Sequence, residues 1–180
     1  MDKQSKILNR RFYNRETLKV AQEMLGCFLV RKVKNKIIRA MITDVEAYVG
    51  EDDLACHASK GRTSRTEIMY GPAGHLYVYF VYGMHFIMNI VTEKKEFPAA
   101  VMIRGIKIDD VGYQKTNGPA KACKFLQIDK KLDGWDMTQG EKLWIERGVK
   151  IPKNKIKTGK RIGIDYAGHC THYLWRFYIS

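Results

Sequence analysis

The sequence predicts a single α+β domain with a curved antiparallel β-sheet, short flanking helices and a protruding β-hairpin. A chain of 180 residues, of which 45% are hydrophobic, suits one domain built around one core. Its β-rich runs are short, and two pairs of them are joined by brief turn segments, which favours antiparallel hairpins. The sequence contains no internal repeat or low-complexity tract, so we expect residues 1–180 to form one unit.

The first expected element is a short helix near the N-terminus. Asn14 is its predicted N-cap, and Leu18, Ala21 and Leu25 follow at helical spacing. Gly26 comes next, and glycine is a common residue just past the end of a helix.

Two hairpins, three further strands and one more helix are expected after that. The first hairpin joins 27–33 to 37–48 through Lys34-Asn35-Lys36, and the second joins 76–81 to 84–92 through Tyr82-Gly83. The remaining strands are 100–108, 142–145 and 175–179. Pro119–Leu126 predicts a helix with proline in its first turn, and Val49–Gly74 is the longest expected loop.

Charge indicates the class of partner. The chain carries 32 Lys and Arg against 19 Asp and Glu, a formal net charge of +13 at pH 7. Such an excess attracts phosphate polyanions and anionic membrane surfaces, and nucleic acid is the leading class of partner. A charged fraction of 28% with four prolines argues against a disordered, collagenous or membrane-embedded chain.

The compartment is expected to be the cytosol. The longest apolar run, 76–91, is interrupted by polar residues and is shorter than the roughly 20 residues of a membrane-spanning helix. Residues 1–11 carry charges throughout and lack the apolar stretch of a secretory signal, so we expect a flexible basic arm there. Four cysteines lie far apart without a Cys-x-x-Cys pair, which predicts reduced thiols.

Acidic and basic residues are segregated along the chain. Residues 44–53 contain five acids and no base, whereas residues 150–161 contain six bases and no acid. The basic run includes Lys153, Lys155 and Lys157, which either contact phosphates or belong to a solvated loop.

One expected strand face combines a carboxylate with a phenol. Alternation along a strand places Ile42, Asp44, Glu46 and Tyr48 on the same face. Arg104 lies within an apolar run and needs an anionic partner if it is buried, for which Glu46 is a candidate. An exposed strand face and an edge-strand arginine are the alternatives.

The second hairpin places aromatic residues where they could contact a base. Tyr77 and Tyr79 share one face of its first strand, while His85 and Asn89 share a face of its second. Tyr82 at the tip suits insertion between base pairs, because a ring replaces lost stacking. The alternatives are that the tyrosines are ordinary β-formers and that Asn89 is a satisfied core amide.

Four collinear motifs resemble those of the alkyladenine (methylpurine, or 3-methyladenine) DNA glycosylase family. They are Asp44-Val45-Glu46-Ala47-Tyr48-Val49-Gly50, the run 76–90, Asn117-Gly118-Pro119-Ala120-Lys121 and Arg161-Ile162-Gly163-Ile164. The likeness extends from about residue 12 to about residue 179. Each motif is short, but four in the same order form a specific signal.

The resemblance implies a role for each matching residue. Glu46 would activate the hydrolytic water, and Arg104 and the backbone carbonyl of Ile162 would help to place it. Tyr48, His57 and Tyr79 would stack on the flipped base, Tyr82 would fill the gap in the duplex, and Asn89 would screen the base edge. His85 departs from the family pattern, which has an aromatic residue there.

The implied reaction needs neither a metal nor a cofactor. A carboxylate supplies the base, and alkylation already makes the purine a good leaving group. We therefore expect a monofunctional hydrolase that extrudes 3-methyladenine, hypoxanthine or ethenoadenine from double-stranded DNA at a cost of roughly a few kcal/mol. It is expected to be a monomer with no membrane contact, in the cytoplasm or nucleoid, or in the nucleus of a eukaryote.

Two other functions remain open. A zinc-dependent nucleic-acid module could use Cys56, His57, His169, Cys170 and His172, although these residues do not have the spacing of structural zinc ligands. A non-catalytic basic nucleic-acid-binding protein, such as an RNA-binding barrel, fits the charge but explains neither Glu46 nor Arg104. A glycosylase with lyase activity would need an amine nucleophile, for which the chain offers many lysines.

Overall fold

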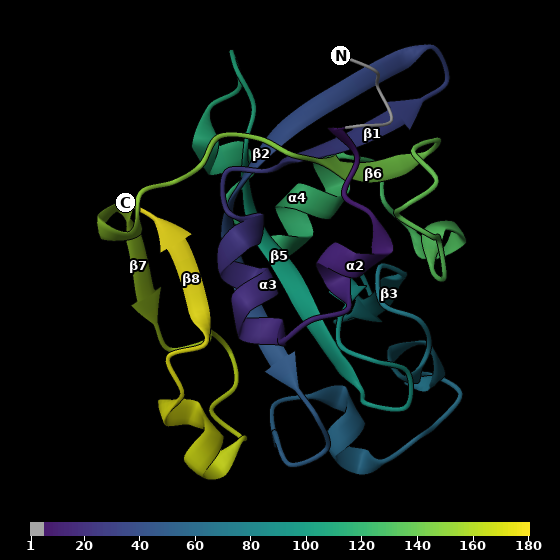
Figure 1. Cartoon of the computed structure of the whole chain (residues 1–180), viewed down its shortest axis with the longest axis vertical. Coiled ribbons are helices and arrows are strands. Elements are labelled where there is room, and N and C mark those ends of the chain that lie inside the picture. Colours follow the sequence, from purple (N-terminus) through teal and green to yellow (C-terminus); the bar gives the residue numbers. More distant parts are fainter. Residues whose placement is uncertain (1–5) are drawn as a thin grey trace.

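An antiparallel sheet runs through the centre of the computed structural model, which describes residues 6–180 (Figure 1). In that range it has eight strands, six of them in the order β3-β4-β5-β2-β1-β6, while β8 pairs with both β2 and β7. The strands are β1 (Phe28–Val33), β2 (Lys36–Val49), β3 (Leu76–Val81), β4 (His85–Val91), β5 (Ala99–Lys107), β6 (Leu143–Glu146), β7 (Ile156–Gly159) and β8 (Arg176–Ile179). The α+β class, the antiparallel sheet and both hairpins are as predicted.

Short helices flank the sheet. The α-helices are α2 (Arg10–Tyr13), α3 (Thr17–Met24) and α4 (Pro119–Phe125). The 3₁₀ helices are η1 (His57–Lys60), η2 (Glu67–Tyr70), η3 (Tyr113–Lys115), η4 (Lys130–Leu132), η5 (Lys153–Lys155) and η6 (Gly168–His172). Both η1 and η2 lie within the predicted long loop 49–74. No helix among the described residues has the length and apolar composition needed to cross a membrane.

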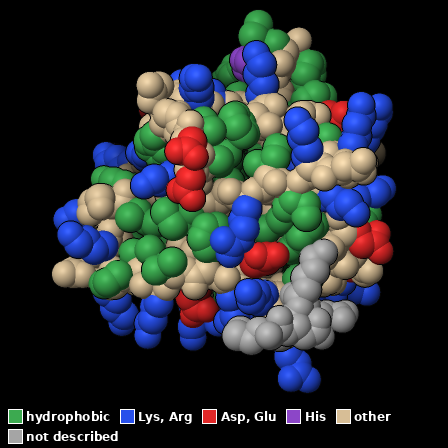
Figure 2. All heavy atoms as spheres, turned by 90° about the horizontal axis from the view of Figure 1, so that it is seen from above, with side chains coloured by type: hydrophobic (Ala, Val, Ile, Leu, Met, Phe, Trp, Pro, Cys, Tyr) green, Lys and Arg blue, Asp and Glu red, His purple; other side chains and the backbone are tan. Residues whose placement is uncertain are grey.

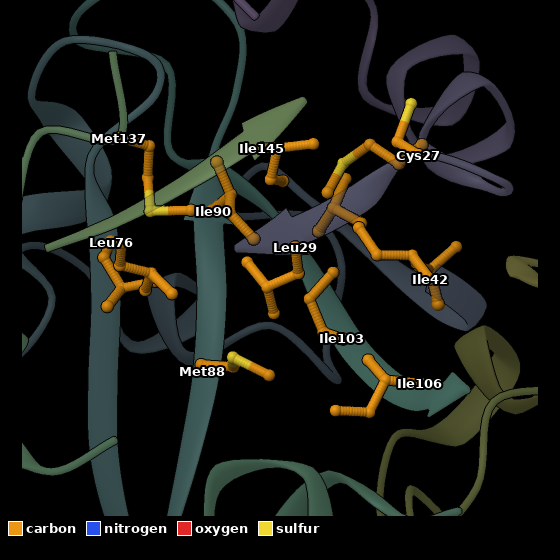
Figure 3. Close-up of a cluster of buried hydrophobic side chains, with 14 of the residues drawn as sticks. Cys27, Leu29, Ile42, Leu76, Met88, Ile90, Ile103, Ile106, Met137 and Ile145 are labelled. Carbon is orange, nitrogen blue, oxygen red and sulfur yellow. The ribbon is translucent and has the colours of Figure 1, made fainter. Parts of the chain in front are cut away.

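The two faces of the sheet carry different clusters. Leu76 and Val78 of β3 belong to the main core, whereas Tyr77 between them joins a second cluster with Ala100 of β5. Figure 3 shows part of the main core, where side chains such as those of Leu29, Ile42, Leu76, Ile90, Ile103 and Ile145 meet from neighbouring strands. The candidate site residues lie on the side of the second cluster.

The predicted N-terminal helix begins later than expected. Asn14 is the C-cap of α2, and the N-cap of α2 is Asn9, whose side chain accepts a hydrogen bond from the Phe12 N–H. At the start of α3, the N–H and hydroxyl groups of Thr17 donate to the Glu93 carboxylate over 2.7 and 2.9 Å. The start of α3 is therefore bound by a residue far along the chain, which local sequence does not reveal.

Part of the predicted flexible arm is packed. Residues 1–5 lie outside the described residues. Leu8 is 1% exposed within the main core, and its N–H donates to the carbonyl of Ile145 over 2.8 Å. Ile7 forms a β-bridge with Glu146. For residues 6–11 the expectation of a free arm is wrong, because burial of a leucine outweighs the surrounding charges.

The pairing of β2 with β5 is interrupted by two offsetting irregularities. Ile42 pairs with Ile106, Asp44 with Gly105 and Val45 with Ile103, so each strand has one extra residue. Those extra residues are Thr43 in β2 and Arg104 in β5. A β-bulge of this kind alters which face a side chain takes. Alternation resumes beyond it, with Val45 and Ala47 in the main core.

The prediction that Ile42 shares a face with Glu46 is wrong because of this bulge. Ile42 lies in the main core together with Val45. Gly105 allows the two strands to approach here, since a Cβ atom on it would lie 3.0 Å from the Cβ of Asp44. The bulge therefore separates an apolar half of β2 from the half that carries the site.

Candidate functional site

A fully buried carboxylate occupies the centre of the candidate site. The Glu46 side chain is 0% exposed. Its Oε1 accepts a 2.9 Å hydrogen bond from the Ile162 N–H and lies 3.2 Å from the Arg104 guanidinium. Its Oε2 accepts a 2.8 Å hydrogen bond from the Tyr48 hydroxyl. The predicted pairing of Glu46 with Arg104 is confirmed, and the predicted exposed strand face is excluded.

Burial and hydrogen bonding act on Glu46 in opposite directions. Burial raises the pKa of Glu46, because a low-dielectric surrounding disfavours its charged form. Arg104, the Ile162 N–H and the Tyr48 hydroxyl each lower this pKa, whereas nearby Asp44 raises it further. The three donors therefore favour an ionised carboxylate at a buried position.

A chain of alternating charges extends from Glu46. The Asp44 carboxylate accepts two short hydrogen bonds from Arg176 of β8, one from Nε at 3.0 Å and one from Nη2 at 2.7 Å. Arg104 Nε lies 3.9 Å from the same carboxylate. Because Asp44 is 2% exposed and opposed by two guanidinium groups, the acidic segment contributes little uncompensated charge here.

A small pocket beside Glu46 is lined by aromatic and polar side chains. Its walls include Tyr48, His57, Tyr77, Tyr79 and Asn89. The ring centroids of His57 and Tyr79 are 4.5 Å apart, and those of Tyr77 and Tyr79 are 5.3 Å apart. All four residues that the sequence assigned to a base pocket are therefore brought together, with Tyr77 added.

The pocket is narrow. Its volume of about 20 Å³ is room for one water molecule. The His57 Nδ1 lies 2.9 Å from the Tyr77 hydroxyl, and burial, with Arg65 and Lys60 nearby, lowers the pKa of His57 to about 4. His57 is therefore neutral at neutral pH, and its ring can pack against another without a desolvated charge.

Asn89 is buried in the pocket wall and makes one hydrogen bond to the backbone. It is 4% exposed, and its Nδ2 donates to the carbonyl of Tyr77 over 3.3 Å. Asn89 also lines the pocket. Both sequence alternatives for Asn89, a core amide and a pocket residue, describe part of what is found.

Tyr82 is at the tip of the second hairpin, 88% exposed to solvent. Tyr82 and Gly83 both have positive φ, +53° and +66°, and the Met84 N–H closes the turn on the Val81 carbonyl over 3.2 Å. Two other apolar side chains of the hairpin are exposed beside it, Phe80 at 49% and Met84 at 68%. Three apolar side chains are therefore exposed at or near the tip of this hairpin.

The three lysines that the sequence predicts as phosphate contacts are exposed, but they do not line the pocket. Lys153 and Lys155 are in η5, and Lys157 is in β7, a strand that the sequence did not predict. Lys153 borders a different cavity, between α3 and the segment 147–156. Figure 2 shows Lys and Arg side chains spread over one whole face of the molecule rather than gathered in one patch.

Two site residues were missed by sequence reasoning. Arg161 and Asp53 form a buried ion pair beside Tyr48, with side chains 0% and 1% exposed. The signal was present, because Arg161 begins the fourth motif and Asp53 ends the acidic segment, but no local pattern joins residues that are so far apart. Tyr77, which alternation places on the same face as Tyr79, also lines the pocket.

The residues considered for zinc do not assemble. Among residues 6–180, no group of three or more His, Cys, Asp or Glu side chains is placed to hold a metal ion. His57 contacts Tyr77, and Cys56 is buried in the second cluster.

Known proteins resemble this chain over nearly its whole length. The sequence model of the family described as Methylpurine-DNA glycosylase (MPG) matches residues 11–180. A protein of Methanocella arvoryzae named "Putative 3-methyladenine DNA glycosylase" is 41% identical, covering 96% of this chain and 92% of its own. Proteins with the same name from Clostridium acetobutylicum and Legionella pneumophila are 42% and 43% identical, each covering 96% of this chain and 94% of its own.

Proposed function

The chain belongs to the methylpurine-DNA glycosylase family, and from this premise we propose that it hydrolyses the N-glycosidic bond of damaged purines with a water activated by Glu46. Membership makes the protein a monofunctional DNA glycosylase, a hydrolase of N-glycosyl bonds that acts on DNA. The proposed substrates are 3-methyladenine, hypoxanthine and ethenoadenine in double-stranded DNA. We propose that it acts as a monomer in the cytoplasm or nucleoid, or in a nucleus.

Extrusion of the base comes first. A purine inside a duplex is out of reach, and flipping it costs roughly a few kcal/mol in lost stacking and pairing. The exposed ring of Tyr82 is placed to fill the vacated stack, and positive φ at Tyr82 and Gly83 lets the tip project. The narrow pocket must widen to admit the base, with the rings of Tyr48, His57 and Tyr79 as its stacking surfaces.

Cleavage of the bond follows. Loss of the purine develops positive charge on the sugar, and a nearby carboxylate stabilises that charge while it takes a proton from water. Among the described residues, Oε1 of Glu46 faces two donors and Oε2 faces one. Oε2 therefore has a lone pair left for a water molecule. We propose that Arg104 and the Ile162 carbonyl help to place this water.

Selection among purines follows from the pocket wall. Asn89 would discriminate among bases at their exocyclic edge. The amino group of guanine would either clash with the Asn89 side chain or be left without a hydrogen-bond partner. The neutral imidazole of His57 and the tyrosine rings stack on either a cationic methylated base or a neutral one. Lys153, Lys155 and Lys157 are proposed as phosphate contacts.

The observation that carries this proposal is the ionisable carboxylate of Glu46, buried against a stacking pocket and held by three donors. The test is release of free base from duplex oligonucleotides containing 3-methyladenine, hypoxanthine or ethenoadenine, beside an undamaged duplex. In Glu46→Gln, single-turnover excision should fall at least about a hundredfold while lesion binding persists.

Glu51→Gln is the matched control for this test. Glu51 accepts a hydrogen bond from a tyrosine, as Glu46 does, but its partner is Tyr70 and it does not line the pocket. The excision rate of the Glu51→Gln variant should equal that of the parent. Excision by Glu46→Gln at the parental rate would contradict the mechanism, and failure of the parent to release any of the three bases would contradict the proposed substrates.

A further inference from the structure

The buried ion pair of Arg161 with Asp53 is bound to several backbone groups. Nη1 and Nη2 of Arg161 lie 2.5 and 2.7 Å from the two oxygens of Asp53, and Nη1 also donates to the carbonyl of Ala47 over 2.9 Å. Asp53 in turn accepts hydrogen bonds from the backbone N–H groups of Val49 and Ala55, each 3.1 Å long. The pair therefore joins β2, the loop that follows it and the segment at Arg161.

Arg161 lies against the strand segment that carries Glu46 and Tyr48. Ala47, whose carbonyl it binds, lies between Glu46 and Tyr48 in β2. The guanidinium carbon of Arg161 is 4.8 Å from the centroid of the Tyr48 ring. The next residue, Ile162, supplies the N–H bound to Glu46. One side chain thus lies against the stacking ring and immediately precedes the donor to the carboxylate.

We propose that Arg161 and Asp53 are positioning residues, which hold the Ile162 N–H on Glu46 and the Tyr48 ring in the base pocket. The inference rests on the proposed function for the meaning of those two contacts, but the placement of Ile162 can be tested without DNA. No comparison assigns a role to either residue.

The local backbone explains why such a pair is needed. Residues 160–167 form neither helix nor strand, and the Ile162 side chain is 49% exposed, so its own burial does not fix it. A buried ion pair adds little net stability over apolar residues of similar size, because desolvation of two charges offsets their attraction. Its fork geometry, however, fixes both distance and orientation of the segment that it binds.

Other charged and titratable groups also face Glu46. Across all elements packed against it they are Asp44 and Tyr48 of β2, Arg104 of β5, Arg176 of β8, Tyr79 of β3 and Arg161 itself. A test therefore has to separate the position of Arg161 from its charge.

Arg161→Lys and Asp53→Asn make that separation. Lysine keeps the positive charge and loses the fork, so a role through charge alone leaves the pKa of Glu46 unchanged. Asparagine leaves the guanidinium without its counter-charge, and charge alone would then lower the pKa of Glu46. The positioning role gives the same direction in both variants. A weakened hydrogen bond from Ile162 raises the pKa of Glu46 by about one unit, since a bond to a charged group contributes about 1.5 to 3 kcal/mol.

The experiment titrates the Glu46 carboxyl carbon by NMR in protein labelled with ¹³C-glutamate, and then measures single-turnover excision across pH. Both variants should show an upward shift of the Glu46 titration and a matching shift of the acid limb of excision. Arg10→Lys is the control, because Arg10 pairs with Asp136 at 2.5 Å outside the site, and its Glu46 titration should stay at the parental value.

The outcomes are distinct. An unchanged or lowered Glu46 pKa in either folded variant overturns the positioning role, even if thermal stability falls. If one variant does not fold, the titration of the other decides. If the pKa of Glu46 moves upward as expected but the parent excises no damaged base, the positioning of Ile162 stands and the proposed function fails.

Discussion

The hydroxyl of Tyr48 donates a 2.8 Å hydrogen bond to Oε2 of Glu46, two residues earlier on the same strand. The ring that would stack on a flipped base is thereby joined to the carboxylate that would activate the hydrolytic water. Burial raises the pKa of Tyr48 well above that of a free tyrosine, with the charge of Glu46 adding to the effect, so the hydroxyl remains a donor throughout the working pH range.

Tyr48→Phe should therefore slow cleavage more than it weakens binding. The ring remains for stacking, but Glu46 loses one charge-assisted hydrogen bond, which contributes about 1.5 to 3 kcal/mol. We expect single-turnover excision at neutral pH to fall by about tenfold or more, with lesion affinity nearly unchanged in a binding assay. Tyr70→Phe, which removes the corresponding bond to Glu51, serves as control. A loss of affinity with a normal rate would assign the hydroxyl to base recognition instead.

The pH dependence of excision should show a displaced acid limb. Glu46 must be ionised to accept a proton, and burial raises its pKa. Activity is then present above this raised pKa and is lost as pH falls through it, above the value of about 4.3 typical of a free glutamate. His57, with a pKa lowered to about 4, stays neutral across this limb. His57→Gln should therefore leave the acid limb of the pH profile at the same pH as in the parent. A shift of this limb in the His57→Gln variant would contradict its assignment to Glu46.

Tyr82→Ala should weaken extrusion of the base rather than cleavage. The exposed ring acts before the chemical step, by occupying the space that the base leaves. A fluorescent base analogue placed beside the lesion would report a smaller flipped fraction. Tyr82→Phe keeps the ring and should flip as the parent does. Equal flipping by the alanine variant would make Tyr82 a turn residue without a role in extrusion.

Asn89→Ser should relax discrimination against guanine lesions. The shorter side chain removes the group that would meet the guanine amino group, so that 7-methylguanine competes better with hypoxanthine. The measurement is the ratio of single-turnover rates on the two substrates. Asn89 Nδ2 also donates to the Tyr77 carbonyl, so the variant could lose stability. Its thermal unfolding should therefore be measured beside the rate ratio. An unchanged ratio in a stable variant would leave Asn89 as a core amide.

Replacing Lys153, Lys155 and Lys157 together by alanine should reduce the salt dependence of DNA binding. Each phosphate contact contributes about 0.9 to the slope of log affinity against log salt. Lys32, Lys34 and Lys36, near the β1–β2 turn, offer a triple variant with the same loss of charge as control. The slope should fall more for the first triple variant than for the second. Equal slopes would place Lys153, Lys155 and Lys157 in a solvated surface.

Local sequence predicted the elements that depend on local physics. The hairpins follow from turn residues between β-rich runs, and α4 follows from Pro119 at its start. Alternation placed Tyr77 and Tyr79 together, and the cost of a buried charge led from Arg104 to Glu46. In each case the residues themselves contain the information.

What the sequence did not reveal depends on residues that are distant in the chain. Glu93 binds the start of α3, and Arg161 binds Asp53, in both cases across a large part of the sequence. β7 was hidden because Lys157 and Gly159 are poor strand formers, and pairing with β8 overrides that preference. The face of Ile42 was wrongly predicted because a bulge adds a residue that no local signal marks.

The paired bulge places Arg104 outside the regular alternation of β5. Thr43 and Arg104 are each the unpaired residue of their strand, so the ladder on both sides keeps the spacing that it would have without them. Arg104 also has its backbone carbonyl bound by the Gly118 N–H, at 2.8 Å. The guanidinium of Arg104 nevertheless opposes the buried carboxylates of Asp44 and Glu46. A change at position 104 would therefore leave the packing of the hydrophobic core in place but would remove the counter-charge of two buried acids.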